Sequence, residues 1–359
     1  MADTLPDVPD RCPVCKGEQR ESMWTWRRES FLEKIGIERE QNVVICCRCG
    51  IIYRSPPLER EIFNQLHEML AMDLRDDEQL SERVEWLRER FPQLGPDTRV
   101  LEVGSARGLM LKRLREEGIE AHGIEPNPEM VALAVADGLK VYQGYVEDFS
   151  PPEGFYDVVM LLHLLEHIDD PVGFLHSVRK LLKKGGMVYL EVPNLMRIPA
   201  PFGTFLPSFH RTEFVPATLT NTLRLCGLEP VAVEEAFGIR VLAKAAEPTG
   251  KYNLNADGPR IVQEIKRTFG SNLIAKYLGE LICQIDLSDR KTIQSARDAV
   301  RGSPPLANYL RMRLDQVDRL LTRWHNGIRT RPEERWPNVL RDVVETLRDD
   351  MQLAILLAG

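Results

Sequence analysis

Four of the seven cysteines form two Cys-x-x-Cys pairs near the N-terminus. Cys12 and Cys15 make the first pair, Cys46 and Cys49 make the second, and thirty residues separate the pairs. Each pair can fold as a tight turn that presents two thiolates to one ion, and two such turns complete a closed tetrahedral site. The spacing therefore predicts a structural Zn²⁺ site. The alternative is a set of unpaired buried thiols.

A second chemical pattern is a small-residue turn that follows an apolar strand and precedes an amphipathic helix. The turn contains Gly104, Ser105, Ala106 and Gly108. A dinucleotide site needs glycine at the position of Ala106, so that a pyrophosphate can approach the backbone. The acid at the end of the strand, Glu102, would also repel a pyrophosphate, but it suits a cationic ligand.

A second acid indicates which cationic ligand this turn binds. Glu125 lies 21 residues after Gly104, at the end of the next predicted strand. In related folds an acid at this distance accepts hydrogen bonds from ribose hydroxyls. S-adenosylmethionine (SAM) carries an ammonium, a sulfonium and a ribose. Glu102 and Glu125 together therefore favour SAM over NAD.

Residues 98–246 resemble a class I SAM-dependent methyltransferase, of the group that includes ubiquinone-pathway and sugar methyltransferases. Five motifs in order carry the resemblance: Glu102 to Gly108, Gly123 to Asn127, Gly144 to Asp148, Tyr156 to Ile168, and Leu182 to Val188. The chain departs from the family at Ala106, where glycine is usual. The resemblance implies an α/β enzyme with a Rossmann-like seven-stranded sheet that ends in an antiparallel hairpin.

The resemblance also implies further cofactor contacts. Pro126 and Met130 follow the ribose acid, and Met130 is expected near the adenine. Members of the family bind the adenine through the loop that corresponds here to Gly144, Tyr145, Val146 and Glu147. The acid that reads the adenine amine is Glu147 or Asp148, or the contact is with the backbone alone. Leu162 and His163, at the end of the following strand, complete the expected cofactor contacts.

Two histidines and an acid follow the near-continuous apolar run 156–162, which is typical of a central parallel strand. On one helical turn His163, Glu166 and His167 would share a face. His167 could act as a general base, because imidazole titrates near neutral pH. The trio could instead bind a divalent ion, as a similar arrangement does in quinone O-methyltransferases, or the histidines could be structural.

The long loop 193–212 is a further candidate for function. In the resembling fold it lines the acceptor pocket, which makes His210, Arg211 and Glu213 second-rank catalytic candidates. Loops of this length often carry function. The alternative is an ordinary surface connection that ends in a helix cap at Thr212.

The motifs divide the chain into four predicted parts: a zinc-binding module over 1–57, a helical lid or linker over 58–97, the methyltransferase domain over 98–246 and a helical domain over 247–359. The helix before the first core strand either covers the cofactor or simply packs on the sheet. The C-terminal helices repeat an apolar 4,3 spacing. That spacing indicates helix packing within the chain or a homodimer interface.

Composition excludes some classes of protein. The net charge of −7 disfavours nucleic-acid binding. No run reaches the roughly 18 uncharged residues of a membrane helix, and the acidic N-terminus lacks an apolar signal core. We therefore expect a cytoplasmic protein with no membrane partner.

The predicted reaction is SAM-dependent O- or C-methylation of a small polar acceptor, such as a sugar nucleotide or a natural-product intermediate. The choice of acceptor depends on the similarity of the cysteine module to those of some sugar and natural-product methyltransferases. One alternative is an RNA or protein methyltransferase that uses the zinc module to grip a macromolecule. Another is a scaffold protein that binds SAM without chemistry.

Overall fold

The computed structural model describes residues 11–26, 41–55, 77–152, 154–196, 210–235, 238–246 and 258–265. All of them except Trp26 belong to one compact unit, made of residues 1–25, 41–197 and 208–266. The predicted C-terminal helices beyond residue 265, with their possible dimer interface, and the part of the predicted lid over 58–76 lie outside the described residues. In the described part, no helix is long and apolar enough to cross a membrane.

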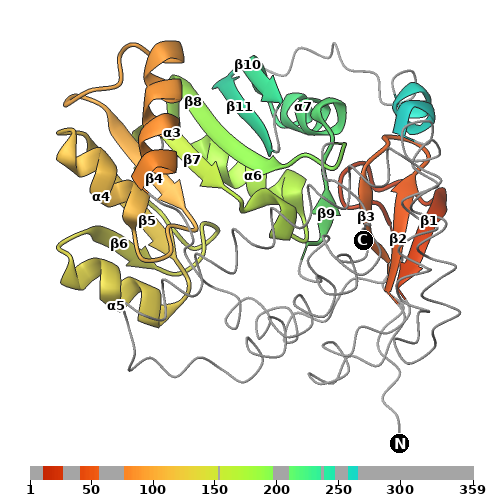
Figure 1. Cartoon of the computed structure of the whole chain (residues 1–359), viewed down its shortest axis with the longest axis horizontal. Helices are drawn as coiled ribbons and strands as arrows, with labels where there is room; N and C mark the ends of the chain where they lie inside the picture. Colours follow the sequence, from red (N-terminus) through yellow and green to blue (C-terminus); the bar gives the residue numbers. More distant parts are fainter. Residues whose placement is uncertain are drawn as a thin grey trace, which may run out of the picture. The chain divides into compact units, whose positions relative to one another are not determined.

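The main sheet has seven strands in the order β10-β11-β8-β7-β4-β5-β6 (Figure 1). Strands β4 to β8 run parallel, and β11 pairs antiparallel with both β8 and β10. This arrangement confirms the predicted Rossmann-like sheet with its C-terminal hairpin. The strands are β4 (Arg99–Val103), β5 (Glu120–Glu125), β6 (Lys140–Gln143), β7 (Tyr156–Leu162), β8 (Leu182–Pro193), β10 (Leu228–Glu235) and β11 (Gly238–Ala245).

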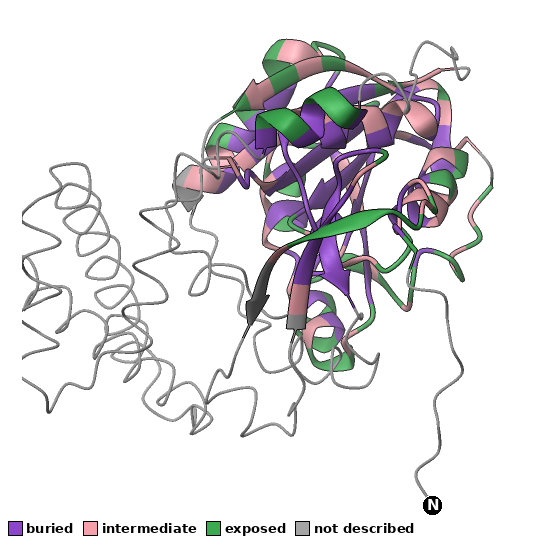
Figure 2. Ribbon diagram, turned by 90° about the vertical axis from the view of Figure 1, so that its right-hand side faces the viewer, coloured by how far each residue is buried: buried purple, intermediate pink, exposed green. Residues whose placement is uncertain are grey.

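Helices cover both faces of this sheet. Leucines and valines of α3 (Asp77–Arg90) and α4 (Leu109–Glu116) pack with Val100, Val158 and Tyr189 of the strands. On the other face, α6 (Pro171–Leu181) and α7 (Pro216–Leu225) share a core with β8 and β11. The central strand β7 is buried along almost its whole length, which explains its apolar run (Figure 2). The remaining described helix of the domain is α5 (Pro128–Ala136).

Helix α3 is docked on the sheet through polar contacts as well as apolar ones. Arg83 Nε lies 2.8 Å from Glu191 Oε2, and both side chains are buried. The Trp86 ring stacks on Tyr189 with ring centroids 5.3 Å apart, and its indole N–H donates to Glu234. The described part of the predicted lid therefore packs on the sheet, which is one of the two alternatives that the sequence leaves open.

The N-terminal module forms a second sheet, in the order β1-β2-β3-β9. Its strands are β1 (Arg20–Trp26), β2 (Gln41–Cys46), β3 (Ile52–Ser55) and β9 (Thr212–Glu213). Strand β9 comes from the end of the long loop after β8, so the sheet joins residues about 160 positions apart. The helix of residues 258–265 packs on the module, where a Cβ on Gly50 would lie 2.6 Å from Ile261. The described residues of the predicted zinc-binding module and of the predicted methyltransferase domain belong to one compact unit, and the boundary at residue 57, which lies outside the described residues, stays a prediction.

Candidate active site and metal centre

The predicted cofactor turn begins directly after β4 and has an unusual backbone. Gly104, Ala106 and Gly108 have φ angles of 73°, 47° and 80°, all in the left-handed region. Glycine adopts this region without cost, whereas alanine is strained there by about 1 to 2 kcal/mol. The backbone thus explains why the family prefers glycine at the position of Ala106. Gly108 is also fixed by packing, because a Cβ there would lie 2.5 Å from Leu139.

Glu125, at the end of β5, holds the cofactor turn in place. Its Oε2 accepts from the backbone N–H of Ala106 at 2.8 Å, and its Oε1 accepts from Asn127 N–H at 2.9 Å. Its backbone carbonyl accepts from Gly144 N–H at 3.1 Å. Each carboxylate oxygen has a second lone pair. The side chain can therefore keep the turn closed and still accept a hydrogen bond from a ribose hydroxyl.

The other predicted cofactor residues lie at the carboxyl ends of β4 to β7 or just after them, where parallel α/β sheets bind ligands. The buried residues of this set are Glu102, Ser105, Val146 and Leu162. Met130 is partly buried, and the exposed residues are Pro126, Tyr145, Glu147 and His163. The hydroxyl of Ser105 is buried without a hydrogen-bond partner among the described residues. A polar cradle with positive-φ turns and an unsatisfied hydroxyl fits a polar ligand such as SAM.

The predicted helical turn after β7 is a short 3₁₀ helix, η1 (Leu165–His167). Glu166 is buried and lies 3.5 Å from His163 Nδ1 and 3.9 Å from His167 Nε2. Burial raises the pKa of Glu166, but the hydrogen bond from His163 and the neighbouring imidazoles outweigh burial and lower the pKa to about 2. His163 itself is exposed and has a positive φ of 54°.

The loop candidates His210 and Glu213 form a buried pair beside this turn. His210 Nδ1 lies 3.0 Å from Glu213 Oε1, and each side chain is only 6% exposed. Burial lowers the pKa of His210, but the charge and hydrogen bond of Glu213 outweigh it, so the pKa is raised. The His210 ring meets the His167 ring edge to face, with centroids 5.0 Å apart. A carboxylate that accepts from one imidazole nitrogen fixes the tautomer and the orientation of the ring.

The two predicted histidines both approach Glu166, as the shared face predicts. A third histidine joins them from a different region of the chain. Ligating atoms of Glu166, His167 and His210 lie within 4.8 Å of one another, a group that does not include His163. His163 precedes the tight η1 turn with a left-handed backbone and is exposed.

Several residues of the site carry no signal in the sequence. Arg54 of β3 donates through Nε to the backbone carbonyl of His210 at 2.8 Å. Glu191 of β8 lies 3.9 Å from His163 Nε2 and also pairs with Arg83 and Arg240. These partners are separated by 28 to 156 residues along the chain. Only the chain topology brings them together.

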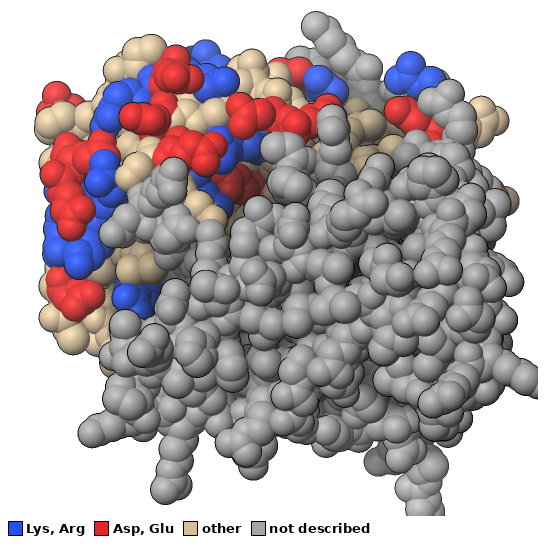
Figure 3. Space-filling view, viewed as in Figure 1, with Lys and Arg blue, Asp and Glu red and all other residues tan. Residues whose placement is uncertain are grey.

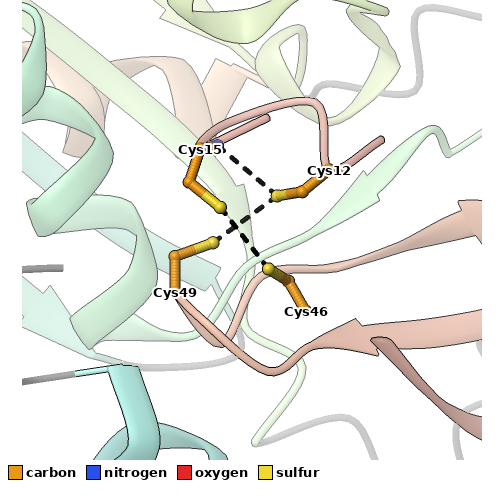
Figure 4. A group of neighbouring side chains, drawn as sticks. All are labelled: Cys12, Cys15, Cys46 and Cys49. Carbon is orange, nitrogen blue, oxygen red and sulfur yellow. Dashed lines mark hydrogen bonds between the residues drawn. The ribbon is translucent and has the colours of Figure 1, made fainter. Parts of the chain in front are cut away.

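The four predicted zinc ligands converge on one point (Figure 4). Cys12 Sγ lies 3.5 Å from Cys49 Sγ, and Cys15 Sγ lies 3.4 Å from Cys46 Sγ. A tetrahedral ion with sulfur ligands at about 2.3 Å would hold them about 3.8 Å apart. The hydrogen bond from Cys12 lowers the pKa of Cys15 to about 7, and contact with the other sulfurs raises the pKa of Cys12 and Cys49. Four crowded thiols fit a bound divalent cation.

Comparison with known proteins connects these sites to a family. A family model described as a methyltransferase domain matches residues 75–233. The ubiquinone biosynthesis O-methyltransferase of Xanthomonas axonopodis pv. citri (strain 306) is 32% identical over 167 residues, which cover 41% of this chain and 68% of that protein. The corresponding enzyme of Xanthomonas campestris pv. campestris (strain B100) is 34% identical over 154 residues, 37% of this chain and 64% of that protein.

Solved structures with a similar chain path are more distant in sequence. The 1,6-didemethyltoxoflavin-N1-methyltransferase of Burkholderia thailandensis is 19% identical with a TM-score of 0.42, and the match covers 56% of this chain and 98% of that one. A SAM-dependent methyltransferase from Archaeoglobus fulgidus is 20% identical with a TM-score of 0.39, over 46% of this chain and 94% of that one. The sequence relatives and the seven-stranded sheet together show that the chain belongs to the class I SAM-dependent methyltransferases.

Proposed function

We propose that the protein methylates a small polar acceptor, such as a sugar nucleotide or a natural-product intermediate, at a hydroxyl or an acidic carbon. The observation that carries this proposal is the buried pair of His210 and Glu213, 3.0 Å apart. Such acceptors must lose a proton when they attack a methyl group, and an oriented imidazole is suited to take it. An amine acceptor would need no base of this kind.

The chain's own residues would divide the work as follows. Bound SAM supplies an electrophilic methyl group on its sulfonium. Glu102 and Glu125 lie at the ends of β4 and β5, where they hold the ammonium and ribose ends of the cofactor. Glu213 accepts from Nδ1–H of His210, which makes Nε2 the nitrogen that would take the acceptor proton. Alignment of the two reactants supplies the rest of the rate enhancement.

His167 is the second candidate for the base. It is less buried than His210 and lies within reach of the same group of ligating atoms. Its ring contacts the His210 ring edge to face, whereas His210 has the closer carboxylate partner. The two histidines therefore share one site, and His210 is the better oriented base.

A hydroxyl acceptor has additional support from the sequence relatives. The relatives at 32% to 34% identity are ubiquinone biosynthesis O-methyltransferases. The proposal therefore ranks O-methylation first and C-methylation second.

The alternative in which the module grips RNA or protein has less support. Cys12, Cys49 and Ile51 are buried, and Val14, Cys49 and Ile51 lie beside Thr218 and Thr222 of α7. Gly50 packs on Ile261 of the helix 258–265. On the face that Figure 3 draws, acidic and basic side chains of the described residues are interspersed. These features favour a zinc-bound module that is built into the enzyme.

The test is production of S-adenosylhomocysteine by the purified full chain with SAM and panels of phenols, sugar nucleotides and amines. We expect turnover with a hydroxyl acceptor, and we expect His210→Gln to lower it by about 10² to 10⁴ with unchanged SAM affinity. Activity confined to RNA or protein substrates would refute the small-molecule proposal. Turnover confined to amines would refute the role of the base.

A further inference from the structure

We infer that the N-terminal module positions the active site: Arg54 and strand β3 hold the segment that carries His210 and Glu213 against η1. This inference rests on the proposed function, since it concerns the pair that is proposed to take the acceptor proton. It assigns to Arg54 the role of a positioning residue. Arg54 acts through the backbone of His210, whose carbonyl accepts from its Nε.

The first observation is the sheet that the module shares with the loop. Strand β9 pairs antiparallel with β3, with Ile52 opposite Glu213 and Tyr53 opposite Thr212. The Cys46-to-Cys49 knuckle lies between β2 and β3, and Cys46 N–H donates to Ile51 O. The knuckle therefore sets the position of β3, and β3 sets the backbone of Glu213.

The second observation is that Arg54 fixes the residues just before β9. Its Nε donates to the carbonyl of His210 at 2.8 Å, and its backbone N–H donates to the carbonyl of Arg211 at 3.2 Å. The Arg54 residue is only 4% exposed. A charged donor in a buried site makes a stronger hydrogen bond than a neutral one, so this contact fixes the backbone of His210 firmly.

The third observation is that the opposite side of the same segment is bound to η1. Arg211 N–H donates to the carbonyl of Glu166 at 2.7 Å, and Arg211 Nε lies 2.9 Å from Asp169 Oδ1. The segment 210–213 is thus held between the module on one side and the turn after β7 on the other. Two elements that are distant in sequence place His210 beside Glu166 and His167.

The geometry leads to a specific dependence. If the module is displaced, the segment loses Arg54 and β3 but keeps its contacts with η1. His210 should then lose its fixed orientation, while the cofactor turn, which depends on Glu125 and β4, should be unaffected. Displacement of the module should therefore disturb the orientation of His210 and leave the affinity for SAM unchanged.

The experiment measures the full zinc-loaded chain by nitrogen-15 NMR of the histidine rings and by hydrogen exchange of the backbone amide of residue 54, which donates to the Arg211 carbonyl. The ring signal of His210 is assigned with His210→Gln. At a pH above the raised pKa of His210, we expect the unmodified chain to show the neutral tautomer protonated at Nδ1, the atom that faces Glu213. In Arg54→Gln we expect a mixed tautomer and about 10- to 100-fold faster exchange at the amide of residue 54, with normal zinc content and SAM affinity.

Two further variants define the controls. Arg11→Gln removes a positive charge from the exposed surface of the same module, where Arg11 pairs only with Glu18 in the described contacts, and it should change neither signal. Arg54→Lys keeps a buried cation that can donate to the His210 carbonyl, and it should restore the Nδ1 tautomer. An unchanged His210 signal in Arg54→Gln would overturn the inference, and so would equal loss of SAM affinity.

If Arg54→Gln does not fold, removal of zinc from the unmodified chain tests whether the module orients His210. Retained SAM binding with a lost His210 signature supports the inference, whereas retention of both, or loss of both, contradicts it. The readouts do not require methyl transfer. A chain that orients His210 through Arg54 but has no methyltransferase activity would disprove the proposed function and leave the positioning role intact.

Discussion

The side chain of Glu125 accepts a hydrogen bond from the backbone N–H of Ala106 at 2.8 Å, so the acid expected to bind the ribose also closes the cofactor turn. The acid and the turn come from neighbouring parallel strands, β5 and β4. Both groups belong to the predicted cofactor site, but their direct contact makes them one structural unit. Loss of the Glu125 side chain should therefore affect the cofactor and the turn together.

Glu125→Ala should weaken SAM binding by about 10- to 100-fold, because each lost hydrogen bond to a charged group is worth about 1.5 to 3 kcal/mol. Calorimetry with SAM and with S-adenosylhomocysteine measures the effect. Glu129→Ala is the matched control, since Glu129 is exposed on the first turn of α5 and its loss should leave the affinity unchanged. Equal affinities for the two variants would show that Glu125 has no part in binding.

Ala106→Gly should stabilise the protein. Relief of left-handed strain is worth about 1 to 2 kcal/mol, and the greater entropy of unfolded glycine offsets about half of it. Denaturant unfolding of the full chain should show the gain, with SAM affinity retained. Ala134→Gly, inside helix α5, should have the opposite effect and cost about 1 kcal/mol. A destabilised Ala106→Gly would mean that the turn is not strained.

Zinc content should depend on the four clustered cysteines, Cys12, Cys15, Cys46 and Cys49. It should not depend on Cys47, the fifth cysteine of this region. Cys46→Ser should lose the metal and destabilise the module, because a closed four-thiolate site contributes directly to folding. Cys47→Ser is the control: Cys47 is adjacent in sequence but lies outside the sulfur cluster, so its loss should leave one zinc per chain. Elemental analysis and thermal unfolding measure both results. Unmodified protein purified without chelator and free of metal would contradict the zinc proposal.

The pKa of His210 should fall when its carboxylate partner is neutralised. In Glu213→Gln the charge that raises this pKa is absent, while the burial that lowers it remains. Because the folded pKa is above the ordinary value of about 6.5, ionised His210 stabilises the fold fully below that pH. The contribution disappears as pH rises through the raised pKa. NMR titration of the ring and unfolding at pH 5 to 9 measure the two effects.

His210→Gln is the matched comparison for Glu213→Gln. Both variants should remove the same pH-dependent contribution to the free energy of unfolding. The two changes should not add, because each disrupts the same pair. If unfolding free energies of the single variants and the double variant add completely, His210 and Glu213 do not act as a pair.

The sequence by itself determined the parts of this protein that depend on local patterns. The alternation of apolar strands with amphipathic helices indicates an α/β sheet, because side-chain periodicity follows from backbone geometry. The number of strands and the antiparallel hairpin are what the resemblance to the family implies. The turn after β4 and the acid after β5 are adjacent for the same reason, since consecutive parallel strands place their carboxyl ends at one edge. The two Cys-x-x-Cys pairs likewise bring their own sulfurs together through local knuckles, and the structure places all four within one cluster.

Only the tertiary structure decided which residues meet across the chain. Strand β9 pairs with β3, and Arg54 reaches His210 over 156 residues. No periodicity encodes such contacts, because they depend on how the loop after β8 returns to the module. The same holds for His210, which joins Glu166 and His167 from the end of the long loop after β8. Local sequence sets the elements, and long-range packing selects the partners that form the site.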